Sequence, residues 1–232
     1  MALADWVLLT AMSVTSPGSR CAIAQAFAIL PRTAASGLSA NSMLLRYTAA
    51  MRSRQSLPLL WILSDARNDG GLEAALERLP AGSGLVFRHY HLGLRARAAR
   101  FGELAEVARV CGHVVVLADK AALAREWRAA GVYGGAACLM KADGLLRLGT
   151  AHDGEELADA AAAGADGVFL SPVFPTRSHP DARPLGIHGF HVLAQRSPVP
   201  VIALGGMTAE RARELAWPRW GAIDGLVPPH AP

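Results

Sequence analysis

The sequence predicts an α/β protein, a (β/α)8 TIM barrel that lacks its last helix. From Leu57 onward, short apolar runs alternate with helical patterns, which is typical of a parallel sheet covered by helices. The runs are apolar throughout, as expected of strands buried on both faces. Eight such runs can be counted, and eight parallel strands form a barrel of this type.

The expected strands follow one another at regular spacing along the chain. They are Leu59–Ser64, Leu85–Tyr90, Val114–Ala118, Val132–Leu139, Leu145–Gly149, Gly167–Leu170, Val199–Leu204 and Ala222–Val227. The fourth contains several glycines and alanines, which weaken a strand pattern. The seventh ends abruptly at Gly205 and Gly206, where a tight turn is expected.

The helices are expected between these strands. They are Gly71–Leu79, Leu94–Val110, Leu123–Ala130, Glu155–Ala163, Ile187–Gln195 and Ala209–Ala216. Gly131 and Gly164 follow two of them directly, and glycine is the usual residue just after a helix. After the eighth strand the sequence reads P-P-H-A-P, which leaves no room for a further helix. We expect an open flank there, covered by the N-terminal segment or by a second subunit.

Composition narrows the class of protein but not the function. The chain has 232 residues, 52% of them hydrophobic, which is ample for a sizeable core. The net charge of +4 comes mostly from scattered arginines and suits anionic small molecules as well as nucleic acid. No apolar run approaches the roughly 18 residues of a membrane helix. Three widely spaced cysteines, Cys21, Cys111 and Cys138, indicate a reducing compartment. These features predict a cytoplasmic protein.

Residues 1–56 differ in composition from the rest. They are rich in Ala, Ser and Thr and show no strand pattern, so we expect them to be poorly ordered. Met51 would be a natural start just before the first barrel strand. We therefore treat 1–56 as an extension that is not native to the folded protein, a hypothesis that intact-mass analysis tests, and 57–232 as the barrel.

Four motifs occur in order between Gly164 and Met207. They read G-A-D-G-V, P-V-F-P-T, P-L-G and V-I-A-L-G-G-M. In this order and spacing the chain resembles the thiamine-phosphate synthase and thiazole tautomerase family of TIM barrels. The resemblance is good over residues 144–207 and weaker back to Leu57.

The resemblance implies a pocket for phosphorylated substrates at the carboxyl ends of the strands. A thiazole phosphate would be bound by Thr176, Arg177, Ser178, Gly186, Gly205 and Gly206. His179 stands where the family has a lysine. A glycine pair after a strand also lets backbone N–H groups approach an anion, whatever the family.

The resemblance also implies a second anion site and a metal. Arg88 occupies the position of the arginine that binds the diphosphate of the pyrimidine substrate. Val86 and Tyr90 replace two of the family's polar residues there, and we expect His89 to lie at the surface or behind the ligand contacts. Asp119 matches a Mg²⁺ ligand, but no second carboxylate follows the fourth strand before Asp143. One carboxylate would hold Mg²⁺ only if substrate phosphates supplied most of the ligands; otherwise Asp119 caps the next helix.

Thr150 and His152 follow the fifth strand in the place of the family's S-x-H motif. In the synthases the hydroxyl lies near the pyrimidine, and in the tautomerases the histidine transfers protons. Histidine suits this task because its ordinary pKa lies near working pH.

Three functions remain open. The first is a transferase that couples hydroxymethylpyrimidine diphosphate to thiazole phosphate with release of diphosphate. The second is a thiazole tautomerase-like isomerase that uses His152. The third is a non-catalytic module that binds thiazole or thiamine phosphate. All three imply small phosphorylated partners, without nucleic acid or membrane, and leave a homo-oligomer open.

Overall fold

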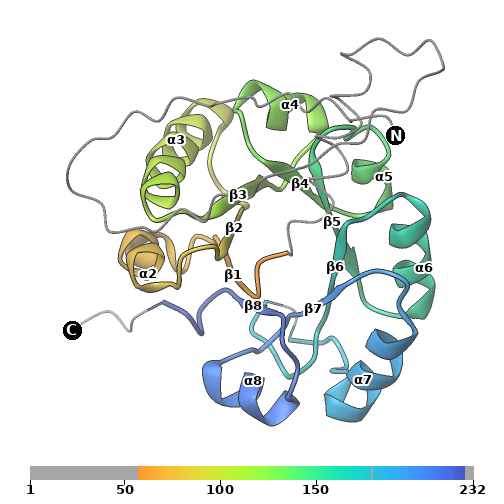
Figure 1. Cartoon of the computed structure of the whole chain (residues 1–232). Helices are drawn as coiled ribbons and strands as arrows, with labels where there is room; N and C mark the ends of the chain where they lie inside the picture. The colour runs from red at the N-terminus through yellow and green to blue at the C-terminus, as the bar shows by residue number, and fades with distance from the viewer. Residues whose placement is uncertain (1–56, 179, 228–232) are drawn as a thin grey trace, which may run out of the picture. The chain divides into compact units, whose positions relative to one another are not determined.

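A computed structural model describes residues 57–178 and 180–227. Eight parallel strands form a closed barrel in the order β1 to β8, so the predicted (β/α)8 architecture is confirmed (Figure 1). The predictions made for residues 1–56 and for His179 lie outside the described residues. The barrel is described as one unit by itself.

The strands are short, and each pairs with its sequence neighbours. Their bounds are β1 Leu60–Leu63, β2 Gly84–Phe87, β3 Val114–Leu117, β4 Gly131–Gly134, β5 Leu146–Ala151, β6 Gly167–Leu170, β7 Val201–Ala203 and β8 Trp220–Ala222. The ring closes where β1 lies parallel to β8, with Leu60 opposite Trp220 and Ile62 opposite Ala222.

Helices surround the strands on the outside (Figure 1). They are the 3-10 turn η1 Asp69–Gly71 and the α-helices α2 Leu72–Arg78, α3 Leu94–Val110, α4 Ala121–Glu126, α5 Ala136–Leu139, α6 Gly154–Ala162, α7 Gly186–Arg196 and α8 Ala209–Leu215. Among residues 57–227, no helix follows β8, in line with the expected missing last helix. No helix in the described ranges is long and apolar enough to span a membrane.

Two predicted strands needed correction. The fourth was expected over Val132–Leu139, but the strand stops at Gly134 and the residues after Gly135 form helix α5. Alanine, leucine and cysteine without β-branched neighbours fit a short helix as well as a strand. The eighth was expected over Ala222–Val227, but β8 ends at Ala222. The residues after it form a loop at the barrel mouth.

The core has two layers because side chains on a strand alternate between the two faces. Trp61 and Leu63 of β1 point into the barrel, and Ile62 between them packs against the outer helices. The interior also holds Phe169 and Tyr133, whose rings meet edge to face. The barrel interior is therefore filled by side chains.

Candidate functional site

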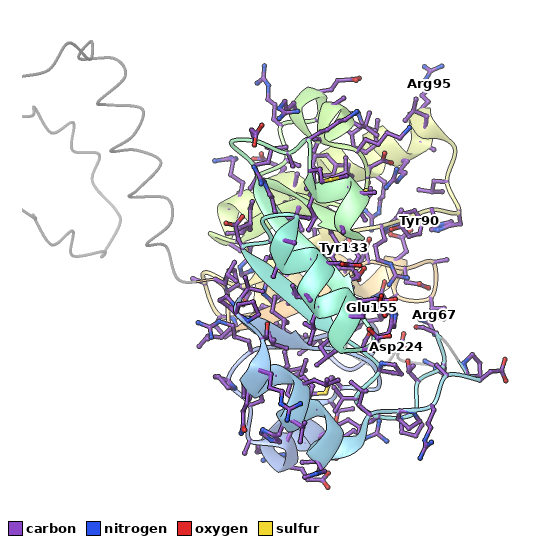
Figure 2. The ribbon with its side chains drawn as sticks, turned by 90° about the vertical axis from the view of Figure 1, so that its right-hand side faces the viewer. Arg67, Tyr90, Arg95, Tyr133, Glu155 and Asp224 are labelled. Atoms are coloured by element: carbon purple, nitrogen blue, oxygen red, sulfur yellow. The ribbon has the colours of Figure 1, made fainter. Side chains whose placement is uncertain are left out.

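A cavity of about 600 Å³ lies at the carboxyl ends of the strands. This is the end of a (β/α)8 barrel where binding sites form, and the volume suits small-molecule ligands. Figure 2 shows Tyr90, Arg67 and Asp224 toward this end of the barrel. The lining residues that the sequence had singled out are Arg88, Thr150, His152, Thr176, Arg177, Ser178, Gly205 and Gly206.

Arg88 forms one wall of the cavity, just after β2. Its Nη2 donates to Asp65 Oδ2 at 2.9 Å, and its side chain is 19% exposed. Its Nε is buried and has no hydrogen-bond partner among the described residues. Burial alone would raise the pKa of Asp65, but hydrogen bonds from Arg67 and the charges of Arg67 and Arg88 outweigh it and lower that pKa. Asp65 is thus a carboxylate that offsets only part of the Arg88 charge.

The opposite wall is the turn between β7 and α8. Gly205 and Gly206 have φ of 90° and 62°, in the region that favours glycine. No hydrogen bond in the described part of the chain uses their backbone N–H groups. The hydroxyl oxygen of Thr208 accepts the N–H of Arg211 and so caps α8. The wall therefore offers backbone donors to an anion.

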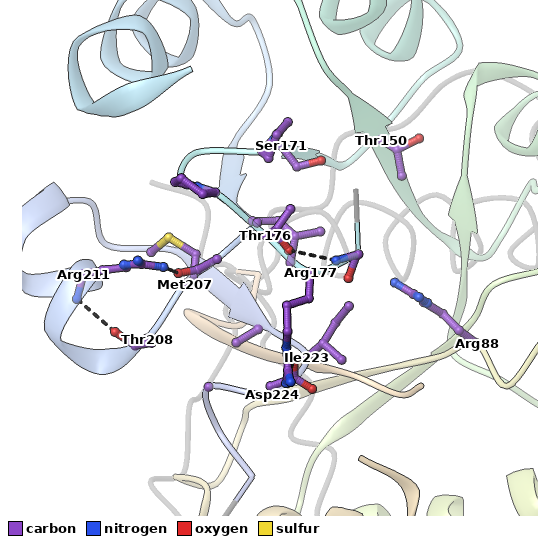
Figure 3. A pocket seen from close by; sticks show the side chains of 18 of the residues that line it. Arg88, Thr150, Ser171, Thr176, Arg177, Met207, Thr208, Arg211, Ile223 and Asp224 are labelled. Carbon is purple, nitrogen blue, oxygen red and sulfur yellow. Dashed lines mark hydrogen bonds and ion pairs between the residues drawn. The ribbon is translucent and has the colours of Figure 1, made fainter. Parts of the chain in front are cut away.

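Arg211 completes this wall. Its Nη1 donates to the carbonyl oxygen of Gly206 at 2.5 Å, and its guanidinium lies 5.1 Å from the ring centre of Phe174. Figure 3 shows Arg211 and Thr208 across the pocket from Arg88. The two walls therefore carry separate cationic groups.

The loop after β6 crosses between the walls. Thr176 Oγ1 accepts the Ser178 N–H at 3.4 Å, and Ser178 Oγ accepts Nη2 of Arg67 at 2.9 Å. Arg177 Nη2 contacts Asp224 Oδ2 at 2.8 Å, in the loop after β8 (Figure 3). The Arg177 side chain is 75% exposed, so this pair contributes only about 0.2–1 kcal/mol. An incoming phosphate can compete with Asp224 for Arg177.

Thr150 and His152 line the third side, at the end of β5. Glu156 Oε2 accepts both the Nδ1–H of His152, at 2.7 Å, and its backbone N–H, at 2.8 Å. A carboxylate can only accept, so Nδ1 carries the proton and Nε2 of the neutral ring has the free lone pair. Glu156 thus fixes the orientation of the imidazole and the ring nitrogen that carries the proton.

Gly186 is not among the residues that line this cavity. Its N–H donates to the carbonyl oxygen of Val173 at 3.0 Å, and its φ of 68° starts helix α7. The role expected for Gly186 in the phosphate pocket thus stays a prediction, and its N–H already has an acceptor in the protein. Its function in the structure is to fasten the loop after β6 to α7.

Asp119 does not offer a free carboxylate to a metal. Its Oδ2 contacts Arg97 Nη1 at 2.5 Å, and its Oδ1 accepts the N–H of Lys120 at 2.7 Å. Asp143, the next carboxylate after β4, is 89% exposed and paired with Arg147. The described residues contain no group of three or more His, Cys, Asp or Glu suited to a metal ion. The donor set therefore does not fit Mg²⁺ at Asp119.

Sequence reasoning missed several residues of the site. Tyr133 lines the cavity from β4, and burial raises the pKa of its phenol to about 12, so it stays neutral. Arg211 and Asp224 also line it. His89 was expected at the surface or behind the ligand contacts; it is 1% exposed and lies behind Arg88, against Ser64. Arg211 was within reach of the sequence, since it lies on the turn of helix that follows the glycine pair, whereas Asp224 was hidden inside the misplaced eighth strand.

Comparison with known proteins gives a consistent result. Residues 60–222 match the family described as thiamine monophosphate synthase. The thiamine-phosphate synthase of Chloroflexus aurantiacus is 29% identical over 179 residues, covering 72% of this chain and 82% of that protein. That of Methanoregula boonei is 30% identical over 175 residues, covering 67% and 78%. A putative thiamine-phosphate synthase 2 of Aquifex aeolicus is 41% identical over only 64 residues, 34% of that protein.

Among solved structures, thiamine phosphate pyrophosphorylase from Pyrococcus furiosus superposes with a TM-score of 0.62 at 23% identity. The superposition covers 72% of this chain and 85% of that chain. At this identity the likeness supports the barrel fold.

Proposed function

The chain belongs to the thiamine monophosphate synthase family, and on that premise we propose that it is a transferase that joins hydroxymethylpyrimidine diphosphate to thiazole phosphate. Family membership supports a role in thiamine biosynthesis in general. The observation that carries the specific step is the pair of cationic walls: Arg88 on one side of the cavity and Arg211, beside the glycine pair, on the other. Two anionic substrates need two such groups.

The reaction that fits this arrangement is a displacement. The thiazole nitrogen forms a bond to the methylene carbon of the pyrimidine, and the bond from that carbon to the diphosphate oxygen breaks. The diphosphate leaves with the electron pair, and Arg88 offsets the charge that develops on it. Holding both phosphates fixed brings the reacting atoms together, which replaces an encounter of two molecules by a local step.

The direct test is formation of thiamine phosphate by the purified full chain from the two substrates. We expect product, and we expect Arg88→Gln to lower kcat/KM by about a hundredfold, since an aligned charged donor is lost where charge develops. Arg95→Gln on α3 removes the same charge from an exposed position and should leave the rate unchanged. If folded protein forms no product when both substrates are present in the assay, the transferase assignment is refuted.

One observation favours a second candidate, a thiazole tautomerase-like isomerase. His152 lies in the cavity, and Glu156 fixes its proton on Nδ1. Such a ring can take and return a proton on one substrate, and it needs only one of the two anion walls. Isomerisation of a thiazole phosphate that is lost in His152→Gln but retained in Arg88→Gln would support it. If the protein binds thiazole phosphate but catalyses neither the transfer nor the isomerisation, the non-catalytic binding module is the remaining candidate.

A further inference from the structure

The main chain of Arg88 is held by side chains from two other elements. Its N–H donates to Ser64 Oγ at 2.8 Å, just after β1. Its carbonyl oxygen accepts Nε of Arg97, on α3, at 2.9 Å. Both contacts lie where β2 ends and the chain turns out of the barrel. Arg88 is thus fixed at its backbone.

Arg97 is a buried cation whose charge is balanced by Asp119. Arg97 is 6% exposed, and Nη2 donates to the carbonyl oxygen of Ala118 at 3.0 Å. Its guanidinium also lies 5.5–5.9 Å from the ring centres of Phe87, Tyr90 and Trp127. Of the carboxylates in the described residues, only Asp119 forms an ion pair with it. A buried cation is costly without such a partner, so Asp119 holds the Arg97 side chain in place against the main chain of Arg88.

The other contact rests on a buried polar chain. Ser64 is fully buried, and its Oγ lies 2.7 Å from Nδ1 of His89, whose Nε2 lies 2.8 Å from Asp69 Oδ1. Asp69 can only accept, so Nε2 of a neutral His89 carries the proton, and Nδ1 then accepts the hydroxyl hydrogen of Ser64. His89 has φ of 39°, a conformation that a non-glycine residue keeps only where its surroundings impose it. Arg88 is therefore supported from both sides.

These supports leave one buried donor of Arg88 without a partner. Asp65 takes Nη2, while Nε has no hydrogen-bond partner in the described chain and belongs to a residue that lines the cavity. A buried donor without an acceptor costs about 1–3 kcal/mol. Nε is closed off from the cavity, so an anion there would bind through the exposed part of the Arg88 side chain, which is 19% exposed.

We propose that Asp119 is a positioning residue, which acts through Arg97 to hold Arg88 toward the cavity, and that binding of a diphosphate at Arg88 needs no divalent metal. The proposal rests on the proposed function for the identity of the anion. It differs from the metal role that the family resemblance implies for Asp119. The geometry behind it is the Arg97 ion pair, which already uses the carboxylate.

Calorimetric titration of the full chain with inorganic diphosphate tests this, once in EDTA and once in MgCl₂. We expect the wild type to bind in EDTA, and Arg88→Gln to bind about tenfold more weakly, as expected for a lost charged hydrogen bond. Asp119→Asn keeps an oxygen that accepts from Arg97 but removes the charge that a metal would need. It should weaken binding less than Asp119→Ala does and by the same factor in both buffers, since the acceptor for Arg97 remains although the balancing charge is lost.

Asp119→Ala removes the acceptor as well and should weaken binding by about tenfold, equally with and without magnesium, because Arg97 loses its anchor. Thermal unfolding of each variant shows whether it is folded, and Asp143→Asn serves as a control for loss of an exposed carboxylate. If Asp119 is a positioning residue, Asp119→Asn has to bind inorganic diphosphate more tightly than Asp119→Ala.

Magnesium also binds diphosphate in solution, so the decisive comparison is between wild type and Asp119→Asn at one magnesium concentration. Tightening by magnesium in the wild type that disappears in Asp119→Asn would overturn the inference, even if the protein forms thiamine phosphate. Metal-free binding that depends on Arg88, in protein that forms no thiamine phosphate, would instead uphold the inference and refute the transferase.

Discussion

At the scale of single residues, Arg211 lines the cavity although no sequence motif predicted it as a site residue. Its guanidinium is held between the Gly206 carbonyl oxygen and the Phe174 ring, beside backbone N–H groups that have no partner among the described residues. A cation kept in place by one hydrogen bond and one ring retains further N–H donors, since guanidinium has five. It is therefore suited to bind the phosphate that reaches the glycine pair.

We expect Arg211→Gln to raise KM for thiazole phosphate by about tenfold or more, because a charged hydrogen bond contributes about 1.5–3 kcal/mol. The KM for the pyrimidine diphosphate should stay unchanged, since Arg88 lies on the other wall. Arg213→Gln makes the same charge change two residues along the same helix, at an exposed position. Steady-state kinetics measures both variants. An equal rise in the KM for thiazole phosphate in the two would contradict the role assigned to Arg211.

His89 gives the protein a stability that depends on pH. Burial lowers its pKa from the ordinary 6.5, and the charges of His91 and Arg100 act in the same direction, while Asp69 opposes them. The pKa of His89 is therefore higher in the unfolded chain than in the folded chain. Its contribution to stability is complete above the unfolded pKa and is lost as pH falls toward the folded one.

We accordingly expect the free energy of unfolding to fall as the pH drops from about 7.5 through the ordinary histidine pKa of 6.5, with a smaller fall in His89→Gln. The partner Asp69 titrates below this window, since hydrogen bonds from His89 and Arg100 lower its pKa despite burial. Urea titrations across the window measure the slope. His188→Gln, which removes an exposed histidine, should keep the slope of the wild type, and equal slopes in all three proteins would contradict the prediction.

At the scale of elements, the β7–α8 turn is shaped by the loop after β6 as much as by any ligand. A Cβ on Gly206 would lie 2.4 Å from the carbonyl oxygen of Pro175, and one on Gly205 would lie 2.6 Å from Cα of Pro172. Both positions also have positive φ. The glycine pair therefore allows the loop that carries Thr176 and Ser178 to lie against the turn.

Alanine substitutions at Gly206 and Gly82 distinguish the effect of positive φ from the effect of the close approach of the loop. Gly82 has φ of 82° but open space where a Cβ would stand. We expect Gly82→Ala to cost about 1 kcal/mol for the backbone conformation alone. Gly206→Ala should cost more and should also weaken thiazole phosphate binding, because the loop has to move. Denaturant midpoints and KM values measure both effects, and equal stability losses with unchanged KM would show that the close approach has no consequence.

The elements also show where sequence patterns reach their limit. Strand and helix alternation located β1, β2, β3, β5, β6 and β7 because each is a short apolar run with a turn on both sides. The same pattern failed at Val132–Leu139, since periodicity does not separate a short helix from a short strand. It failed again at β8, where an apolar run continues past the three residues that pair with β1. Pairing between distant segments decides such ends.

The site was predictable to the extent that it depends on the carboxyl ends of strands. Arg88, Thr150, His152 and the glycine pair were found because they lie at or shortly after the carboxyl ends of strands that the sequence had located. The pairing of Asp119 with Arg97 was not visible, because Arg97 lies on a helix and reaches the mouth only in the folded chain. Ion pairs between elements are a property of the packed structure.

At the scale of the whole molecule, the barrel is not uniformly held together. The β4–β5 and β5–β6 interfaces each have four registered residue pairs, whereas β7 and β8 share one, between Ala203 and Trp220. Fewer backbone hydrogen bonds protect the β7–β8 interface, so local opening should begin there. This interface lies beneath the glycine pair and Asp224, which line the cavity.

We therefore expect the amide hydrogens of Val201–Ala203 and Trp220–Ala222 to exchange faster than those of Leu146–Ala151 and Gly167–Leu170, in hydrogen exchange followed by mass spectrometry. Inorganic phosphate at millimolar concentration should slow exchange at β7 and β8, because an anion held by the glycine pair stabilises the closed form. The β4–β5 amides serve as the internal control and should not change. If β7 and β8 exchange as slowly as β5 and β6, or if phosphate slows all strands alike, the barrel opens as one unit and the mouth has no independent motion.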